Sequence, residues 1–229
     1  MNLAIAILCG VTILAYAALM ILSFVNGGLS PRSIFFALIM LFGVVWASTS
    51  YLDVSTLNGF AWMFRITTCS LAGIYFFMLL FSLTLIRNIT RRQLLLLSTL
   101  GAIILITFTI AVLILPNSWI FSDYEVLDGI VNAKRNIMPT ILFNAILAVF
   151  GFSALAAHII AYRMADGRRK TIIRNTMIAL IVFSVFDIVF TFALNILGTD
   201  GPRVIGPMSV LIVGPIFYGS IVGHSDDEL

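Results

Sequence analysis

The chain has 229 residues, of which 61% are hydrophobic and only 10% are charged, and its mean hydropathy is +1.13. Soluble domains carry about 25% charged residues, so this composition excludes a soluble globular domain and predicts an integral membrane protein made mostly of helices. The net charge of +3 indicates no nucleic-acid partner, because the basic residues lie between apolar segments, where membrane topology explains them.

Seven apolar segments follow one another along the chain, separated by polar or turn-forming residues. A helix needs about 20 apolar residues to cross the roughly 30 Å core of a bilayer, and these segments are of that order. They are residues 2–24, 33–52, 59–86, 93–115, 139–162, 175–197 and 204–223. We therefore predict an all-α, seven-transmembrane helix bundle over residues 1–223, followed by a polar tail at 224–229.

The longest connection covers residues 117–138 and is the only one with several acidic residues, Asp123, Glu125 and Asp128. It begins directly after Pro116, which ends the fourth apolar segment because proline does not continue a helix. We expect the middle of this connection to form a short helix that lies on the membrane surface.

The basic residues alternate from one connection to the next. Short loops rich in Lys and Arg stay on the cytoplasmic side of a membrane. Nine of the 13 basic residues lie in the first, third and fifth connections: Arg32, Arg87, Arg91, Arg92, Arg163, Arg168, Arg169, Lys170 and Arg174. The last five form the densest cluster, which we assign to a cytoplasmic loop. The alternation predicts an N-terminus outside and a C-terminus in the cytoplasm.

Two charged residues lie within the predicted spans. Charges inside a membrane are rare and usually face the bundle interior, so each is a functional candidate. Asp187 lies about halfway along the sixth span, and Arg65 lies roughly 9 Å into the third span from its outer end. We expect the two to approach each other, with Asn144 and Asn195 as polar neighbours. Such a group either pins the bundle or lines a cavity for a ligand or a proton.

Arg65 has a second interpretation, in which its side chain extends towards the lipid headgroups while its stem stays in the apolar layer. Trp62, three residues earlier, is then an anchor at the membrane interface. His158 lies near the inner end of the fifth span, where a polar residue at the interface is the expected role. His158 and His224 are the only histidines, so no multi-histidine metal site can be built.

No motif of an enzyme, a metal site or a phosphate-binding loop occurs in the chain, so we predict no catalytic activity and no cofactor. Cys9 and Cys69 both lie in apolar runs and are expected to be free thiols. A retinal pigment needs a lysine in the last helix, and residues 204–223 contain none. The seven spans therefore do not indicate a rhodopsin.

Four soft patterns carry a resemblance to a known family. They are the segment from Phe36 to Trp46, the aromatic-rich segment from Phe76 to Thr84, the basic turn Gly167-Arg168-Arg169-Lys170, and a last span containing Gly and Pro. In these features the chain resembles the seven-transmembrane N-terminal sensor region of prokaryotic histidine kinases. The resemblance implies a multi-pass protein of a prokaryotic plasma membrane. It also implies a two-component input domain, whose bundle senses a stimulus and whose last helix drives a cytoplasmic output module.

The chain departs from that family because only six residues follow Gly223, which leaves no room for a phosphoacceptor helix or an ATP-binding domain. We expect a sensor whose kinase or other output module either continues after Leu229 or is a separate partner; a homodimer is left open. The alternative is a small transporter or channel subunit with Asp187 as its polar intramembrane site, although no internal repeat is evident. A membrane-embedded enzyme or an assembly subunit is a third interpretation, against which the sparse polar residues argue.

Overall fold

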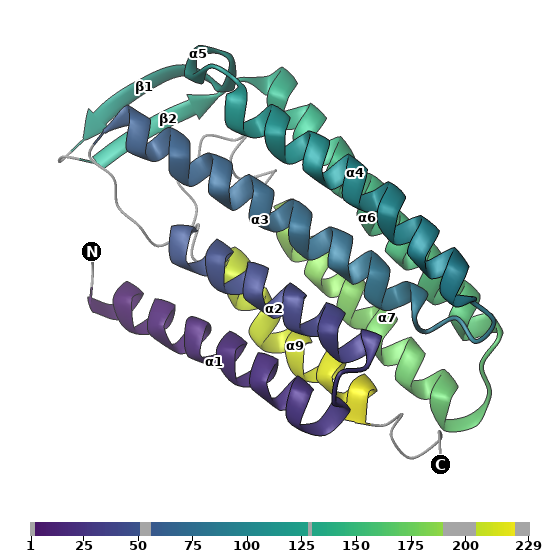
Figure 1. Cartoon of the computed structure of the whole chain (residues 1–229). Helices are drawn as coiled ribbons and strands as arrows, with labels where there is room; N and C mark the ends of the chain where they lie inside the picture. Colours follow the sequence, from purple (N-terminus) through teal and green to yellow (C-terminus); the bar gives the residue numbers. More distant parts are fainter. Residues whose placement is uncertain (1–2, 51–55, 128–129, 190–204, 223–229) are drawn as a thin grey trace.

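The computed structural model describes residues 3–50, 56–127, 130–189 and 205–222 (Figure 1). Most of these residues are helical, which confirms the all-α class. The long helices are α1 (Leu3–Gly27), α2 (Pro31–Ser50), α3 (Leu57–Leu83), α4 (Arg91–Ile114), α6 (Ile137–Arg163), α7 (Gly167–Asp187) and α9 (Ile205–Val222). Between α4 and α6 lie the one-turn helix α5 (Asn117–Ile120) and the strands β1 (Phe121–Leu127) and β2 (Ile130–Arg135).

Five of the long helices, α1, α2, α3, α4 and α6, are long and apolar enough to cross a membrane. The other two described long helices, α7 and α9, are not among these five. The basic residues Arg168, Arg169, Lys170 and Arg174 lie within the first turns of α7, and α9 is a shorter apolar helix. Length and composition thus support a multi-pass membrane protein.

Local sequence signals explain where several helices begin and end. The Thr56 hydroxyl accepts a hydrogen bond from the Gly59 backbone N–H at 3.2 Å and caps α3. Thr90 and Gln93 form a reciprocal capping box at the start of α4, so two backbone donors are satisfied. α1 ends at Gly27, because Gly28 adopts the left-handed conformation (φ 55°) that closes many helices.

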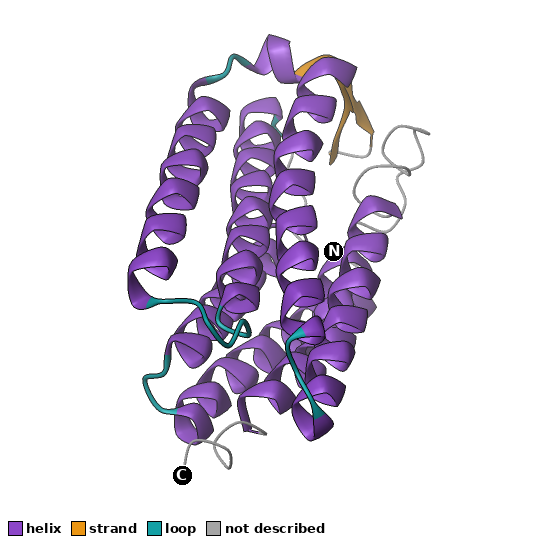
Figure 2. Cartoon of the chain, turned by 90° about the vertical axis from the view of Figure 1, so that its right-hand side faces the viewer, coloured by secondary structure: helices purple, strands orange, loops and turns teal. Residues whose placement is uncertain are grey.

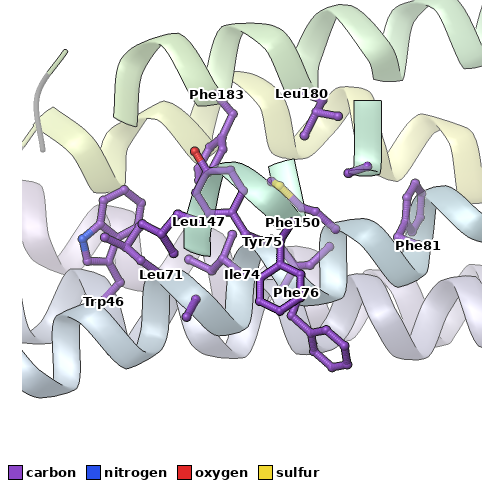
Figure 3. Packing of buried hydrophobic residues seen from close by; sticks show 14 of the residues in the cluster. Trp46, Leu71, Ile74, Tyr75, Phe76, Phe81, Leu147, Phe150, Leu180 and Phe183 are labelled. Carbon is purple, nitrogen blue, oxygen red and sulfur yellow. The ribbon is translucent and has the colours of Figure 1, made fainter. Parts of the chain in front are cut away.

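α3 is the central helix of the bundle. Its span is 72% buried, whereas those of α1 and α4 are each 17% buried, and α3 packs against α2, α4 and α6. α9 packs against α1, α2 and α7 (Figure 1). The core consists largely of aromatic and aliphatic side chains of α2, α3, α6 and α7, among them Trp46, Ile74, Phe81, Phe150 and Phe183 (Figure 3).

Basic side chains tie three helix connections together at one end of the bundle. Arg32, at the start of α2, donates to the Thr84 carbonyl at 3.1 Å, just after α3 ends. Arg169, in the first turn of α7, donates to the neighbouring Leu85 carbonyl at 2.9 Å. The Lys170 ammonium lies 4.9 Å from the ring centre of Tyr162, near the end of α6. We call this the basic end.

The basic cluster from Arg163 to Arg174 was predicted to be a loop, and that prediction is wrong in its extent. α6 continues to Arg163 and α7 already begins at Gly167, so Arg168, Arg169, Lys170 and Arg174 are helical residues. Asp166 has the extended backbone of an N-cap residue, and α7 begins directly after it. The short turn still lies at the basic end, since Arg169 binds beside the end of α3.

The connection between α4 and α6 also differs from the expected surface helix. β1 and β2 form an antiparallel two-stranded hairpin at the end of the bundle opposite to the basic end (Figure 2). Phe121 is buried at the base of this hairpin, with its ring centre 5.5 Å from that of Phe60 and 5.6 Å from that of Phe64. The hairpin is therefore attached to α3 by aromatic packing. We call this the hairpin end.

Candidate functional site

The candidate site begins with a buried carboxylate at the C-terminal end of α7. Asp187 is only 4% exposed, and the hydroxyl of Tyr75 on α3 donates a hydrogen bond to its Oδ2 at 2.9 Å. A buried ionisable group is costly unless it has hydrogen-bond partners, so this contact stabilises the carboxylate in the bundle. Asp187 thus links α7 to the central helix.

The ring of Tyr75 is held by aromatic neighbours. Its centre lies 5.6 Å from that of Phe183, which in turn makes an edge contact with Trp46 at 6.2 Å (Figure 3). Gly151 of α6 lets that helix approach the same ring, because an added Cβ would stand 3.2 Å from Cε1 of Tyr75. The contacts from α6 and α7 fix the direction in which the Tyr75 hydroxyl points.

A cavity of about 380 Å³ lies beside this pair, between α6 and α7. Pockets for small molecules usually measure about 300–1,000 Å³ and combine apolar walls with a few polar groups. The polar residues of the lining are Tyr75, Asn144, Ser184 and Asp187; the walls include Leu147, Leu155 and Leu180. The arrangement can hold a small apolar molecule and orient one polar group of it against a carboxylate.

Arg65 and Asp187 are not brought together, so their predicted pairing is wrong. Arg65 Nη2 donates to the Leu115 carbonyl and, at 2.8 Å, to Oδ1 of Asn117. Asp187 binds Tyr75, which lies ten residues, or about 15 Å of helix, further along α3 than Arg65. Arg65 and the Asp187–Tyr75 contact therefore lie at different levels along α3.

Arg65 instead joins α3 to the end of α4. It is 7% exposed, and its guanidinium carbon lies 5.3 Å from the ring centre of the exposed Trp62. Asn117, which accepts from Arg65, donates onwards to Oδ1 of Asn58 at 3.1 Å. Arg65 therefore closes the hairpin end of the bundle and is not part of the cavity.

Asn144 does line the cavity together with Asp187, as the sequence suggested. Asn195 lies outside the described residues. Tyr75 and Ser184 were not predicted as site residues. Ser184 is one helical turn before Asp187, a spacing that places both side chains on one face and was available as a signal. Tyr75 had no comparable signal, because tyrosine is common in apolar helices.

His158 lies in the core rather than at the membrane interface. Its side chain is fully buried, Nδ1 lies 3.0 Å from the Ala154 carbonyl, and the imidazole meets the ring of Phe217 on α9 edge-on at 6.5 Å. The prediction of an interfacial role was wrong, because the imidazole is fully buried and meets Phe217 of α9. Among the described residues, no group of three His, Cys, Asp or Glu side chains could hold a metal ion.

No protein-family model and no curated protein matches this chain. The chemistry of the site therefore rests on the chain's own residues. At the edge of this apolar cavity, the Asp187 carboxyl group accepts a hydrogen bond from the Tyr75 hydroxyl.

Replacing Tyr75 with phenylalanine is expected to lower the free energy of unfolding by about 1–3 kcal/mol, the usual cost of leaving a buried polar group without its partner. Thermal unfolding in detergent micelles would measure this loss. Tyr162→Phe removes the same hydroxyl at the basic end, away from the cavity, and should change the midpoint little. Equal midpoints for Tyr75→Phe and the unaltered chain would contradict a stabilising bond to Asp187.

Proposed function

We propose that this chain is a seven-span membrane sensor domain, with its N-terminus outside, that passes a stimulus to a cytoplasmic signalling module. The module, a kinase or another output protein, is either fused after Leu229 or a separate partner. The observation that carries the proposal is the buried Asp187–Tyr75 bond beside a cavity on α7. A buried ionisable group at the edge of a cavity is suited to sensing, because a bound molecule changes its hydrogen bonding.

The position of α9 supports this proposal. α9 packs against α7, which carries Asp187, and also against α1. The Tyr16 hydroxyl of α1 donates to the Pro207 carbonyl at 2.9 Å, and Asn26 of α1 donates to the Tyr218 hydroxyl. α1 and α9 are consequently parallel, and α9 ends at the basic end. A shift of α7 is therefore transmitted through its packing against α9, the last helix, to the basic end.

Pro215 gives α9 a point at which the helix can bend. Proline within a helix removes one backbone hydrogen bond and weakens the helix locally. It lies between the two contacts to α1, at Pro207 and at Tyr218. We propose that the stimulus shifts the population between two arrangements of α7 and α9, with the bend at Pro215 absorbing the difference.

The charge distribution supports the proposed orientation. Arg32 and Arg169 both bind carbonyls next to the end of α3, so basic residues from separate connections gather at one end. Loops rich in Arg and Lys stay in the cytoplasm, and the basic end is then cytoplasmic. The cavity and the hairpin belong to the middle and outer parts of the bundle, where a stimulus from outside or from the bilayer arrives.

Asp187→Asn tests this function in the cell that makes the protein. The chain is tagged at its own locus, membranes are supplied with ATP labelled in the γ-phosphate, and acid-labile phosphohistidine is measured in the tagged protein and in proteins that copurify with it. We expect labelling to change by at least about fivefold, the lower end of typical couplings between sites. Asp123→Asn makes the same chemical change at an exposed aspartate of the hairpin and should leave labelling unchanged.

Unchanged labelling in Asp187→Asn, with the protein still inserted, would contradict the sensor proposal.

The second candidate, a transporter or channel subunit, is favoured by one observation, the carboxylate beside a cavity inside the bundle. In that case purified protein in vesicles carries a proton or ion flux that Asp187→Asn abolishes and Asp123→Asn does not.

A further inference from the structure

We infer that the basic end binds anionic phospholipids, with the headgroup phosphate held by exposed arginines and the acyl chains lying along apolar side chains of the same helices. The arginines concerned are Arg91, Arg92, Arg163 and Arg174, which we call the lipid-side arginines. The inference goes beyond the proposed sensor function and is independent of it. It needs only that the chain crosses a membrane, which the length and composition of its helices support.

The basic side chains at this end fall into two groups. Arg32, Arg169 and Lys170 are half-buried, and each contacts a carbonyl or a ring within the bundle. The lipid-side arginines are exposed, and within the described part of the chain none of the four makes a hydrogen bond or an ion pair. Their guanidinium groups are thus available to a molecule outside the bundle.

On α4, two lipid-side arginines continue into an exposed apolar surface. Arg91 and Arg92 are followed one turn later by Leu95 and Leu96, which are 59% and 60% exposed. Residues four apart lie on the same face of a helix, so each arginine shares its face with a leucine. Helical side chains lean towards the N-terminus, and α4 begins at the basic end, so both arginines lean away from the apolar layer.

α6 and α7 repeat this arrangement. Arg174 on α7 is followed one turn later by the exposed Ile178, and α7 also begins at the basic end. Arg163, the last residue of α6, is preceded by the exposed Ile159 and Ile160. Charged and apolar side chains therefore occupy one face of each of three helices, with the charge at the basic end.

These faces favour a lipid over a protein that docks on the end of the bundle. Exposed apolar residues on membrane-crossing helices face lipid chains, and arginines at the ends of the same faces lie at the level of the headgroups. A lipid matches both parts of such a face, the charge with its phosphate and the apolar side chains with its acyl chains.

The charge at this end selects an anionic headgroup. Eight of its nine basic residues are arginines, and Asp166 is the one acidic residue there within the described ranges. A guanidinium presents a planar fork that matches two phosphate oxygens, whereas an ammonium acts as a point charge. A basic residue at a membrane surface strengthens the attraction to anionic lipids about fivefold. Phosphatidylcholine also carries a phosphate, but its own cation offsets this attraction.

The test uses phosphatidylglycerol and phosphatidylcholine with the same photoreactive diazirine near the top of one acyl chain. Each is added separately to the purified full chain in phosphatidylcholine vesicles, and cross-linked peptides are quantified by mass spectrometry. We expect phosphatidylglycerol to label residues 91–100 and 174–181 at least fivefold more strongly, and unlabelled phosphatidylglycerol to compete. Residues 106–114, at the other end of α4, are the internal reference and should be labelled equally by both lipids.

Two variants with the same chemical change separate a bound lipid from diffuse attraction. Arg92 and Arg87 are both exposed at the basic end, but Arg87 lies in the turn before α4 and is not part of a helix. Arg92→Gln should reduce phosphatidylglycerol labelling of residues 91–100 about fivefold, while Arg87→Gln should change it little. Equal reductions would mean that only the overall charge of this end matters, and would overturn the inference.

Two further outcomes contradict the inference without any variant. Equal labelling of the basic end by the two lipids would overturn it and leave an acidic protein surface as the partner of these arginines. Competition by soluble glycerol 3-phosphate as strong as that by phosphatidylglycerol would show that a free phosphate is bound in place of a lipid.

Discussion

Gly43→Leu is expected to lower the free energy of unfolding by roughly 3 kcal/mol, at the upper end of the usual cost of overpacking. A Cβ atom at Gly43 of α2 would overlap the ring of Tyr16, which is fully buried on α1. Small residues let membrane helices approach closely, and here the absent side chain admits a whole aromatic ring. Displacing Tyr16 also removes its hydrogen bond to the Pro207 carbonyl of α9.

The substitution thus loosens three helices at once, α1, α2 and α9. Unfolding by increasing mole fraction of SDS in mixed micelles, followed by circular dichroism, measures the loss. Gly10→Leu is the matched control, since an added Cβ at Gly10 has no atom within 4 Å. A Gly43→Leu protein as stable as Gly10→Leu would show that Tyr16 is not packed against α2 in this way.

Arg65→Met should cost about 1.5–3 kcal/mol, the range for a hydrogen bond to a charged group. Methionine keeps much of the apolar stem but removes both donors, so the Leu115 carbonyl and Asn117 Oδ1 lose their shared partner. The end of α4 and the one-turn helix α5 then detach from α3. Hydrogen exchange at residues 113–120 should increase more than exchange in the middle of α3.

Two variants control this experiment. Arg92→Met removes an exposed arginine at the other end of α4 and should have little effect, as exposed charges contribute little. Arg65→Lys keeps the charge without the planar fork and should recover only part of the stability. Full recovery by lysine would mean that the charge alone matters, and no loss in Arg65→Met would contradict a role for Arg65 at the hairpin end.

The helices were predictable from the sequence because a backbone in lipid must satisfy its own hydrogen bonds, so long apolar runs have few alternatives to the helix. The hairpin was missed although a signal was present. Asp128-Gly129, between Val126-Leu127 and Ile130-Val131, is a strong two-residue hairpin pattern. A surface helix was expected in this connection, whereas the β-branched residues Val126, Ile130 and Val131 lie in the paired strands.

The site was predictable only in part, because the sequence shows which polar residues lie in apolar spans but not which of them meet. Asp187 and Asn144 stand out because polar groups in apolar spans are rare, and both border the cavity. Rarity and depth do not show which helices are neighbours or how each is rotated. Arg65 was expected beside Asp187 because of its depth, but Asp187 accepts a hydrogen bond from Tyr75, whose ring lies against Gly151 of α6.

Arg32 and Arg169 give the basic end a double role. Positive-inside sorting needs only charge, and lysine serves it as well as arginine. The contacts to the Thr84 and Leu85 carbonyls, however, are made by guanidinium groups that reach across from other helices. Under the proposed orientation, the residues that direct insertion are the same ones that fasten the helices afterwards. Sidedness and assembly would then be coupled at these two positions, and a sequence drifting from arginine to lysine here would retain the first while weakening the second.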